Sequence, residues 1–330
     1  MKALLIDLSG ENPVMVAGEA PDPKPSRNEL LVKIEATALN RADLLQKIGK
    51  YPVPDGASSI LGLEMAGRVE QAGDGVTRFR EGDRVFGLLP GGGYAERCVI
   101  HEKMAMPLPQ ELSFEEAAAV PETFLTAYQA IFWLGELKPE ETVLIHAGAS
   151  GVGTSAIQLA KELRSARIIT TAGTEQKNDL CRNLGSNLSV NYKKQDYSEI
   201  IGETFGKDQV DLVIDFVGAP YWQKNVDLLA MDGRLVYLSF LGGTKVKSAN
   251  LVPLLRKRLT IMGSTLRNRN QDYKQRLTAD FWQDAGRALR EGKIAPEIDS
   301  VFNWLEVEKA HSRMKNNQNA GKIVLTGMQD

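Results

Sequence analysis

The sequence predicts an α/β fold in which a doubly wound parallel sheet is combined with a second, β-rich domain. Short apolar runs separated by Pro, Gly and Asp turns fill the first 120 residues, which indicates strands. From about residue 123, strand-like and helix-like segments alternate. The strands of this middle region are continuously apolar, as expected when helices cover both faces of a parallel sheet.

Length and composition support two globular domains. The chain has 330 residues, of which 43% are hydrophobic and 25% charged, so a large core is possible and disorder is not expected. The 42 acidic and 40 basic residues give a net charge of −2 without a basic block. Charge therefore gives no support for a nucleic acid or an anionic membrane as partner.

Cysteine content and hydropathy bear on the compartment. Only Cys98 and Cys181 are present, which excludes a disulfide framework and favours a reducing compartment. The apolar N-terminal stretch is too short for a signal peptide, and no apolar run approaches the roughly 18 residues of a membrane span. We therefore expect a cytoplasmic protein.

The β-rich region is expected to contain strands at 30–39, 65–73, 83–89 and 95–100. After residue 265, the sequence predicts a long helix over 273–292, an extended stretch over 298–304, a short helix and a last strand within 321–325. This tail resembles the front region more than the middle. We therefore expect residues 1–122 and 265–330 to form one domain and residues 123–264 to form the other.

The middle region is expected to begin with a helix over 123–135 that ends at Gly135. Expected strands cover 142–148, 166–173, 187–192, 210–218, 234–240 and 258–264. Expected helices cover 154–164, 175–185 and a stretch through 228–231. Repeated strand–helix units of this kind predict βαβ connections and a parallel sheet.

A glycine-rich loop, HAGASGVG, separates the first of these strands from its helix. Gly148, Gly151 and Val152 belong to a turn in which glycines permit close approach of the backbone to a pyrophosphate at the helix N-terminus. Ser150 stands where the dinucleotide fingerprint has its middle glycine, and its hydroxyl is expected to face the cofactor as a candidate catalytic group. A simple strand–helix turn is the alternative, which the repeated strand–helix pattern disfavours.

The end of the next strand indicates which dinucleotide binds. NAD-specific sites place an acidic residue there to accept a hydrogen bond from the ribose 2′-hydroxyl, but residues 170–174 contain no carboxylate. Gly173 leaves space, Thr174 offers a hydroxyl, and Lys177 can neutralise a 2′-phosphate, so we expect NADPH as cofactor. A solvated helix lysine is the alternative for Lys177. Tyr192 is expected either to flank this phosphate or to be a half-buried tyrosine at a strand end.

The chain resembles the quinone oxidoreductase (zeta-crystallin-like) branch of the medium-chain dehydrogenase/reductase superfamily. The motifs that carry the resemblance are ATALNRADLLQKIGKYPVPDGAS, ILGLEMAGRV, LLPGGGYAE, VPETFLTAYQ, LIHAGASGVGTSAIQLAK, NYKKQD, YWQKNV, GSTLRNR and GKIVL. The resemblance implies a GroES-like β-barrel catalytic domain beside a Rossmann domain. It also implies a homodimer that pairs through the last strand of the Rossmann sheet, near Leu259 to Gly263.

Zinc-dependent members of that superfamily carry an early cysteine, a Gly-His-Glu motif and a lobe with four cysteines. Here the matching positions are Asn40 and Gly62-Leu63-Glu64, and the lobe is missing, so the resemblance implies a site without metal. Quinones accept hydride without a Lewis acid, which favours zinc-independent NADPH-dependent quinone reduction. A 2-alkenal or enone reductase and a non-catalytic NADPH-binding structural or regulatory protein are the alternatives. We interpret His146 as a packed strand residue.

The resemblance also implies which residues lie near substrate and cofactor. Asn40 lines the cleft between the domains as a candidate catalytic residue, and Asp43 is expected to make structural hydrogen bonds. Tyr51 lies in a loop over the nicotinamide, where it is expected to bind the cofactor and orient a quinone oxygen; packing at the rim is the alternative. Further cofactor contacts are implied for Phe240, Leu241, Ser264, Thr265, Leu266 and Lys322. For Lys322 the contact is with ribose or phosphate, and a surface lysine before a strand is the alternative.

Overall fold

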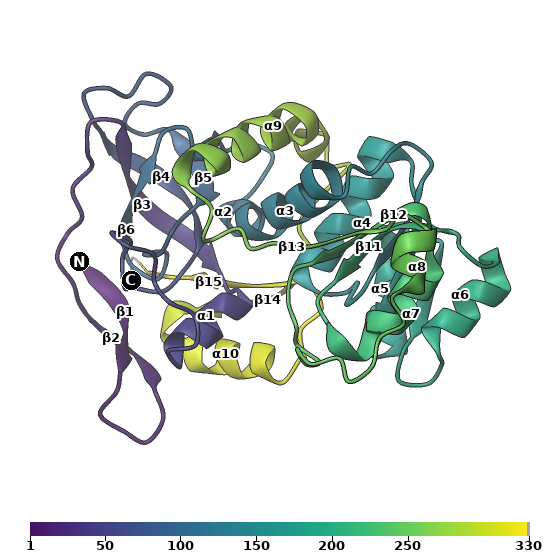
Figure 1. Cartoon of the computed structure of the whole chain (residues 1–330). Coiled ribbons are helices and arrows are strands. Elements are labelled where there is room, and N and C mark those ends of the chain that lie inside the picture. The colour runs from purple at the N-terminus through teal and green to yellow at the C-terminus, as the bar shows by residue number, and fades with distance from the viewer. Residues whose placement is uncertain (329–330) are drawn as a thin grey trace. The chain divides into compact units, whose positions relative to one another are not determined.

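The structure, a computed structural model, describes residues 1–328 and divides into two compact units. Unit 1 consists of Met1–Leu125 together with the segment from Arg267 onward, and unit 2 consists of Thr126–Leu266. In Figure 1, the purple and blue strands of the N-terminal region share unit 1 with the yellow strands near the C-terminus, whereas unit 2 is teal to green.

Unit 1 is built on a seven-stranded sheet in the order β14-β15-β3-β4-β5-β7, with β6 also paired to β3. These strands are β3 (Glu29–Ala38), β4 (Glu64–Ala72), β5 (Arg84–Leu88), β6 (Arg97–His101), β7 (Ala105–Pro107), β14 (Ile298–Asn303) and β15 (Lys322–Thr326). β1 (Lys2–Asp7) and β2 (Val14–Glu19) form a separate antiparallel pair. The antiparallel pairing of β15 with β3 joins Val324 to Ala38 and brings the start of β15 beside residue 40.

The helices of unit 1 are α1 (Arg41–Lys47), α2 (Phe114–Ala118), α9 (Gln271–Arg290) and α10 (Val307–Lys315), with the short helix η3 at Trp304–Glu306. α9 forms because Leu277, Phe281, Ala285 and Leu289 repeat every four residues and are all buried. Its N-cap Asn270 accepts a hydrogen bond from the Tyr273 N–H over 2.9 Å.

Helix α3 (Pro121–Tyr128) continues directly into the π-helical segment η1 (Gln129–Leu134). The sequence predicts one helix ending at Gly135, and Gly135 is indeed the C-cap, where its N–H bonds to the Ala130 carbonyl. The change of helix type at residue 129 could not be read from the apolar pattern, because both helix types keep these side chains buried.

Unit 2 confirms the predicted doubly wound parallel sheet, with the strand order β10-β9-β8-β11-β12-β13. Its strands are β8 (Thr142–Ile145), β9 (Arg167–Ala172), β10 (Leu188–Asn191), β11 (Val210–Asp215), β12 (Leu229–Tyr237) and β13 (Thr260–Gly263). Its helices are α4 (Gly151–Arg164), α5 (Glu175–Leu184), α6 (Tyr197–Phe205), the short helix η2 (Ala219–Tyr221), α7 (Trp222–Leu228) and α8 (Val252–Arg256). The strand order reverses between β8 and β11, and ligands of such sheets bind at the carboxyl ends of strands next to this reversal.

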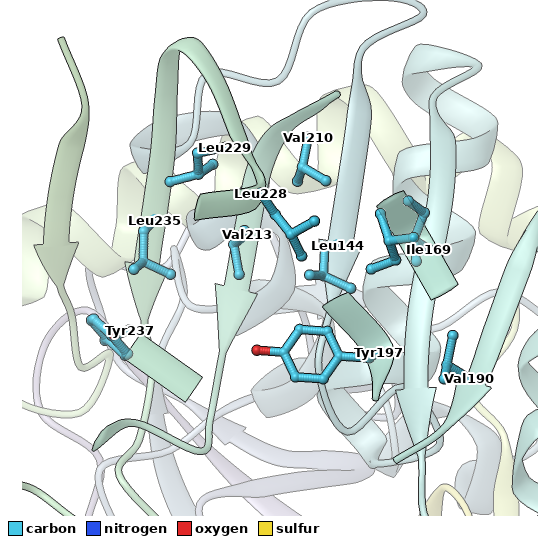
Figure 2. Packing of buried hydrophobic residues seen from close by; sticks show 11 residues of the cluster. Leu144, Ile169, Val190, Tyr197, Val210, Val213, Leu228, Leu229, Leu235 and Tyr237 are labelled. Atoms are coloured by element: carbon cyan, nitrogen blue, oxygen red, sulfur yellow. The ribbon is translucent and has the colours of Figure 1, made fainter. Parts of the chain in front are cut away.

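The core of unit 2 lies on the sheet, as Figure 2 shows. Leu144, Ile169, Val213 and Leu235 project from neighbouring strands and have no exposed surface. Tyr197 from α6 packs among them. Burial of each such aliphatic side chain stabilises the fold by about 1.5–3 kcal/mol, which explains the continuously apolar strands.

One predicted helix ends earlier than expected. The helix expected through 228–231 is α7, which ends at Leu228, and β12 begins at Leu229. Four consecutive apolar residues fit a buried helix and a buried strand equally well. The strand pairing shifts between Leu229 and Arg234, and Asp232 there has a φ of 59°. This irregularity in β12 hides its strand pattern in the sequence.

Candidate functional site

The glycine-rich loop of unit 2 leads from β8 into α4. Ser150 is the N-cap of α4, and its Oγ accepts a hydrogen bond from the Gly153 N–H over 3.1 Å. Ser, Thr, Asn and Asp are preferred at this position because they satisfy a free N–H of the first turn. Helix capping therefore accounts for a serine in place of the fingerprint glycine. Val152 lies half-buried in the first turn of the same helix.

Two glycines permit close packing around this loop. A Cβ atom on Gly148 would lie 2.8 Å from Thr170 Cβ and 2.9 Å from Cys181 Sγ. A Cβ atom on Gly153 would lie 2.5 Å from the carbonyl oxygens of Ala147 and Gly148. Only glycine fits at both positions, so the loop packs against β9 and α4 starts directly over the loop. This arrangement fits a dinucleotide, whose pyrophosphate binds at such a helix N-terminus.

The end of β9 brings together the residues predicted for the 2′-phosphate. A Cβ atom on Gly173 would lie 3.0 Å from Tyr192 Oη, so the tyrosine packs beside this glycine. Thr174 is the N-cap of α5 and accepts a hydrogen bond from the Lys177 N–H over 3.3 Å. Thr174 and Lys177 therefore both lie in the turn and first helical residues that follow the carboxyl end of β9.

Two charged residues here escaped the sequence analysis. Lys193 places its Cε 3.3 Å from a Cβ built on Gly173, which adds an exposed cation beside this strand end. The signal for it was the lysine pair after Tyr192 in NYKKQD. Glu175 follows Thr174, but its carboxylate forms an ion pair with Arg182 over 2.5 Å.

The remaining residues predicted in unit 2 follow the ends of β12 and β13. Exposed Phe240 and Leu241 belong to a turn held beside β11, because the Leu241 N–H donates to the Phe216 carbonyl over 2.9 Å. The Ser264 N–H donates to the Tyr237 carbonyl over 2.9 Å, Thr265 follows, and Leu266 is buried. All of them lie at the carboxyl edge of the sheet, together with the glycine-rich loop.

A buried hydrogen-bond network lies beneath these loops. His146 Nε2 lies 2.8 Å from Asn225 Oδ1, and His146 Nδ1 lies 3.0 Å from Thr171 Oγ1. Asn225 Nδ2 donates to Asp215 Oδ2 over 2.9 Å, so its oxygen faces the histidine, which then donates from Nε2. Tyr197 Oη donates to the same Asn225 oxygen over 3.0 Å.

This network ties three strand ends to one another. His146 follows β8, Thr171 lies in β9 and Asp215 ends β11. The Asp215 carboxylate accepts hydrogen bonds from the backbone N–H groups of Val217 and Gly218 over 2.5 and 3.2 Å. Burial lowers the pKa of His146 to about 4, so its ring is neutral. His146 is thus a packed residue, as interpreted from the sequence, and it also fixes the loops that follow these strands.

Unit 1 contains a second polar cluster, centred on Lys322. Its Nζ donates to Glu64 Oε1 over 2.6 Å, to Asn40 Oδ1 over 2.8 Å and to the Leu39 carbonyl over 2.7 Å. The side chain of Lys322 is only 4% exposed, so the surface-lysine alternative is wrong. An ammonium has three donors, and all three are used inside unit 1. We therefore replace the predicted ribose or phosphate contact of Lys322 by this internal ion pair.

The same cluster fixes Asn40. Its Nδ2 donates to Glu64 Oε1 over 2.7 Å, and its backbone N–H donates to Asp43 Oδ2 over 2.7 Å. Asp43 also accepts hydrogen bonds from the Gly62 N–H and from the Tyr94 hydroxyl, both over 3.3 Å. Asp43 thus makes the structural hydrogen bonds predicted for it. Burial raises the pKa of Asp43 to about 6.

Tyr51 is held by a residue that the sequence analysis did not single out. The guanidinium of Arg267 lies over the Tyr51 ring, 5.2 Å from its centroid. Arg267 is 5% exposed and donates from Nη2 to the Pro90 carbonyl over 3.0 Å. Within residues 1–328, its Nε and Nη1 have no hydrogen-bond partner. Arg267 follows Leu266 in the motif GSTLRNR. The cofactor contacts predicted from this motif are Ser264, Thr265 and Leu266, and they do not include Arg267.

Two further properties concern the described residues as a whole. Within residues 1–328, no group of three or more His, Cys, Asp and Glu side chains has an arrangement that could hold a metal ion. The helices within that range are all too short or too polar to cross a membrane.

Two protein families match this chain. Residues 26–110 match the alcohol dehydrogenase GroES-like domain, and residues 151–282 match the zinc-binding dehydrogenase family. The first match lies in unit 1, and the second covers most of unit 2 and continues into α9. The two families therefore correspond to the β-rich and the dinucleotide-binding parts of the fold.

Individual relatives cover nearly the whole chain. Quinone oxidoreductase-like protein 2 of Bos taurus is 33% identical over 92% of this chain and 87% of its own length. Quinone oxidoreductase of Escherichia coli, solved with NADPH, has a TM-score of 0.83 at 30% identity over 95% of this chain and 96% of its own. An NAD-dependent alcohol dehydrogenase has a TM-score of 0.85 at 30% identity, over 99% of this chain and 100% of its own. The enoyl reductase CurK has a TM-score of 0.84 at 27% identity, over 98% of this chain and 99% of its own.

Proposed function

We propose that this chain, which belongs to the quinone oxidoreductase-like proteins of the medium-chain dehydrogenase/reductase superfamily, reduces quinones with NADPH and without a metal ion. Membership makes it an oxidoreductase with an NAD(P)-binding fold. The observation that carries the finer proposal is the Lys322 ammonium, which bonds to Asn40 and Glu64 at the positions that match metal-site residues of zinc-dependent relatives.

The buried ammonium supports chemistry without a metal. A cation would need the oxygens of Asn40 and Glu64 free, but Lys322 already uses one oxygen of each. Quinones suit such a site because they are intrinsically electrophilic. Tyr51 and the unpartnered Nε and Nη1 of Arg267 would orient a quinone oxygen and stabilise the negative charge that develops there.

The arrangement in unit 2 supports NADPH. The α4 N-terminus would hold the pyrophosphate, and Lys177, Tyr192 and Lys193 would surround the 2′-phosphate. When bound, NADPH supplies a hydride; the protein positions it and excludes water. Ser150 would contact the cofactor as the helix cap, rather than act on the substrate.

A steady-state assay tests this proposal. The full chain is mixed with NADPH or NADH and a panel of ortho- and para-quinones, with and without a strong zinc chelator. We expect oxidation of NADPH only when a quinone is present, slower oxidation of NADH, and no effect of the chelator. Equal rates with both nucleotides would refute the 2′-phosphate site. Loss of activity on adding the chelator, followed by recovery of activity on adding zinc, would refute the metal-free mechanism.

A second candidate function is reduction of 2-alkenals or enones. It is favoured by the similarity to the enoyl reductase CurK, at a TM-score of 0.84. Adding enals and enones to the same panel separates the two activities. Tight NADPH binding without turnover of any acceptor would instead support a structural or regulatory role.

We also propose a homodimer that forms through β13. This strand is an edge of the six-stranded sheet, so its outer N–H and C=O groups are available for pairing with a second copy. Light scattering coupled to size exclusion should give twice the mass of 36.3 kDa. A proline in place of Ile261 should give the monomer mass, because proline removes an N–H and does not fit a paired strand.

A further inference from the structure

A glutamate in the first turn of α3 has no part in the site proposed above. The Glu122 N–H donates to Glu64 Oε2 over 2.8 Å, which ties this turn to the ion pair of Glu64 with Lys322. Two residues later, Phe124 is completely buried and packs against Phe281 of α9, with ring centroids 6.2 Å apart. These contacts fix the backbone of Glu122 within unit 1.

The carboxylate of Glu122 is unpartnered. Within residues 1–328, it makes no hydrogen bond and no ion pair. The residue is half-buried, and its oxygens are not among the completely enclosed polar atoms that lack a partner, so they keep accessible surface. In the same part of the chain, this also holds for the hydroxyl of half-buried Tyr51. Both groups are therefore free to form a hydrogen bond to a bound molecule.

The two groups act on each other electrostatically. Burial raises the pKa of the Tyr51 hydroxyl, and the charge of Glu122 raises it further, whereas Arg267 over the Tyr51 ring lowers it. Lys274 of α9 donates from Nζ to the Arg267 carbonyl over 2.6 Å. Burial lowers the pKa of Lys274, and the charge of Glu122 opposes this effect. Because such effects weaken with distance, Glu122 lies near these three residues, all of them in unit 1.

The protonation state of Glu122 is balanced near neutral pH. Burial raises the pKa of Glu122 to about 7, and the charges of Glu64 and Asp43 act in the same direction. Lys322 and Lys274 oppose them, but the ammonium of Lys322 is already bound to Glu64. About half of the Glu122 side chains therefore carry a proton at pH 7, which is the condition for an efficient general acid.

We propose that Glu122 is the proton donor of the reaction, and that Tyr51 holds the acceptor oxygen beside it. This inference rests on the proposed quinone reduction. The quinone takes up a hydride from NADPH, which carries two electrons, and becomes a hydroquinone anion. The proton moves from the Glu122 carboxyl to the anionic oxygen, where it forms the O–H bond of the hydroquinone. The carboxylate left on Glu122 then takes up a proton from water.

A pH profile of kcat tests the proposal. With saturating NADPH and quinone, kcat of the parent chain should be highest below pH 7 and should fall above it, because only the acid form of Glu122 can donate. Glu122→Gln keeps the size of the side chain but has no acidic proton. It should lower kcat about a hundredfold at pH 6. The two chains should converge towards pH 9, where about one Glu122 in a hundred is still protonated.

Two further variants separate the proton from the fold. Glu122→Asp retains a carboxyl group and should retain the fall of kcat with pH, at a lower kcat. The exposed Glu111→Gln is the matched control and should leave kcat unchanged at every pH. NADPH affinity should be unchanged in all of these variants, because neither glutamate is a cofactor contact proposed above.

Carbon-13 NMR of the chain without nucleotide provides a readout that does not depend on turnover. With glutamate labelled at its carboxyl carbon, the resonance that is missing in Glu122→Gln should titrate near pH 7, and titration near the ordinary 4.5 would overturn the proposal. A parent chain that reduces no quinone would refute the proposed function and this inference with it. Quinone reduction with the same pH profile in the parent chain and in Glu122→Gln would overturn only the role of Glu122.

Discussion

Lys322 Nζ and Glu64 Oε1 lie 2.6 Å apart, and both side chains are almost completely buried. Removing one partner of a buried ion pair leaves the other charge without compensation. Lys322→Met should therefore lower the free energy of unfolding by about 3–5 kcal/mol, measured by urea denaturation. The double variant Lys322→Met/Glu64→Gln should lose less than the single variant, because it leaves no isolated charge. Equal losses would mean that packing, rather than the ion pair, stabilises this cluster.

The depressed pKa of His146 predicts a pH dependence of stability. Because its pKa is about 4 in the folded chain and about 6.5 when unfolded, only the unfolded chain takes up the proton between these values. Stability is therefore full above pH 6.5 and falls as the pH decreases, by about 2 kcal/mol at pH 5 from this residue. Replacement by Gln, which cannot titrate, should flatten the loss between pH 7 and 5 relative to the parent chain. An unchanged slope would contradict a neutral buried His146.

Cofactor selectivity should depend on two lysines that follow the ends of β9 and β10. Lys177→Gln and Lys193→Gln should each raise the KM for NADPH about three- to tenfold, because each removes a charge from the 2′-phosphate, and should leave the KM for NADH unchanged. The neighbouring exposed residue Lys194 provides the matched control, as its replacement by Gln should affect neither nucleotide. A parallel rise for NADPH and NADH would argue against recognition of the 2′-phosphate.

Ser150 offers a test between capping and catalysis. Loss of an N-cap hydroxyl costs about 1 kcal/mol, so Ser150→Ala should lower the thermal midpoint and weaken NADPH binding. Ser150→Asp and Ser150→Asn also cap helices, but only the Asn variant should retain NADPH affinity, because a carboxylate repels the pyrophosphate. A large fall in kcat with unchanged affinity would instead support the catalytic role predicted from the sequence.

The pair of Tyr51 and Arg267 should control turnover of the acceptor. Tyr51→Phe should lower kcat with quinones and leave NADPH affinity nearly intact. Unchanged turnover would mean that Tyr51 only packs at the rim of the site. Arg267→Met should lower kcat/KM for quinones about a hundredfold, as expected for loss of a donor to a developing oxyanion. Arg267→Lys retains the charge but not the planar group over Tyr51. Its kcat/KM for quinones should therefore lie between those of the parent chain and Arg267→Met.

Local patterns in the sequence were sufficient for most strands of the unit 2 sheet and for its glycine-rich loop. Continuous apolar runs marked β8, β9 and β11, and the glycines before α4 marked the turn that precedes it. The error over 228–231 arose because a short apolar segment has no period that distinguishes helix from strand.

Contacts between distant parts of the chain were beyond the sequence. Lys322 and Glu64 are 258 residues apart, so neither residue indicates that the other neutralises it. The position of Arg267 over Tyr51 depends on a similarly distant pairing. Such partners are known only once the pairing of the strands is known. The sequence alone therefore predicts a ligand contact for Lys322, and not its buried ion pair.

The pairing of β15 with β3 also sets an order of events during protein synthesis. Unit 2 is continuous in sequence, so every residue of its sheet has been synthesised before α9 begins. The sheet of unit 1, in contrast, lacks β14 and β15 until residues 298–326 have been translated. A nascent chain thus holds an unpaired β3 edge and an uncompensated Glu64 for most of its elongation. Premature stop codons just before residue 322 should therefore remove β15 and the partner of Glu64, and should leave chains that aggregate or require chaperones.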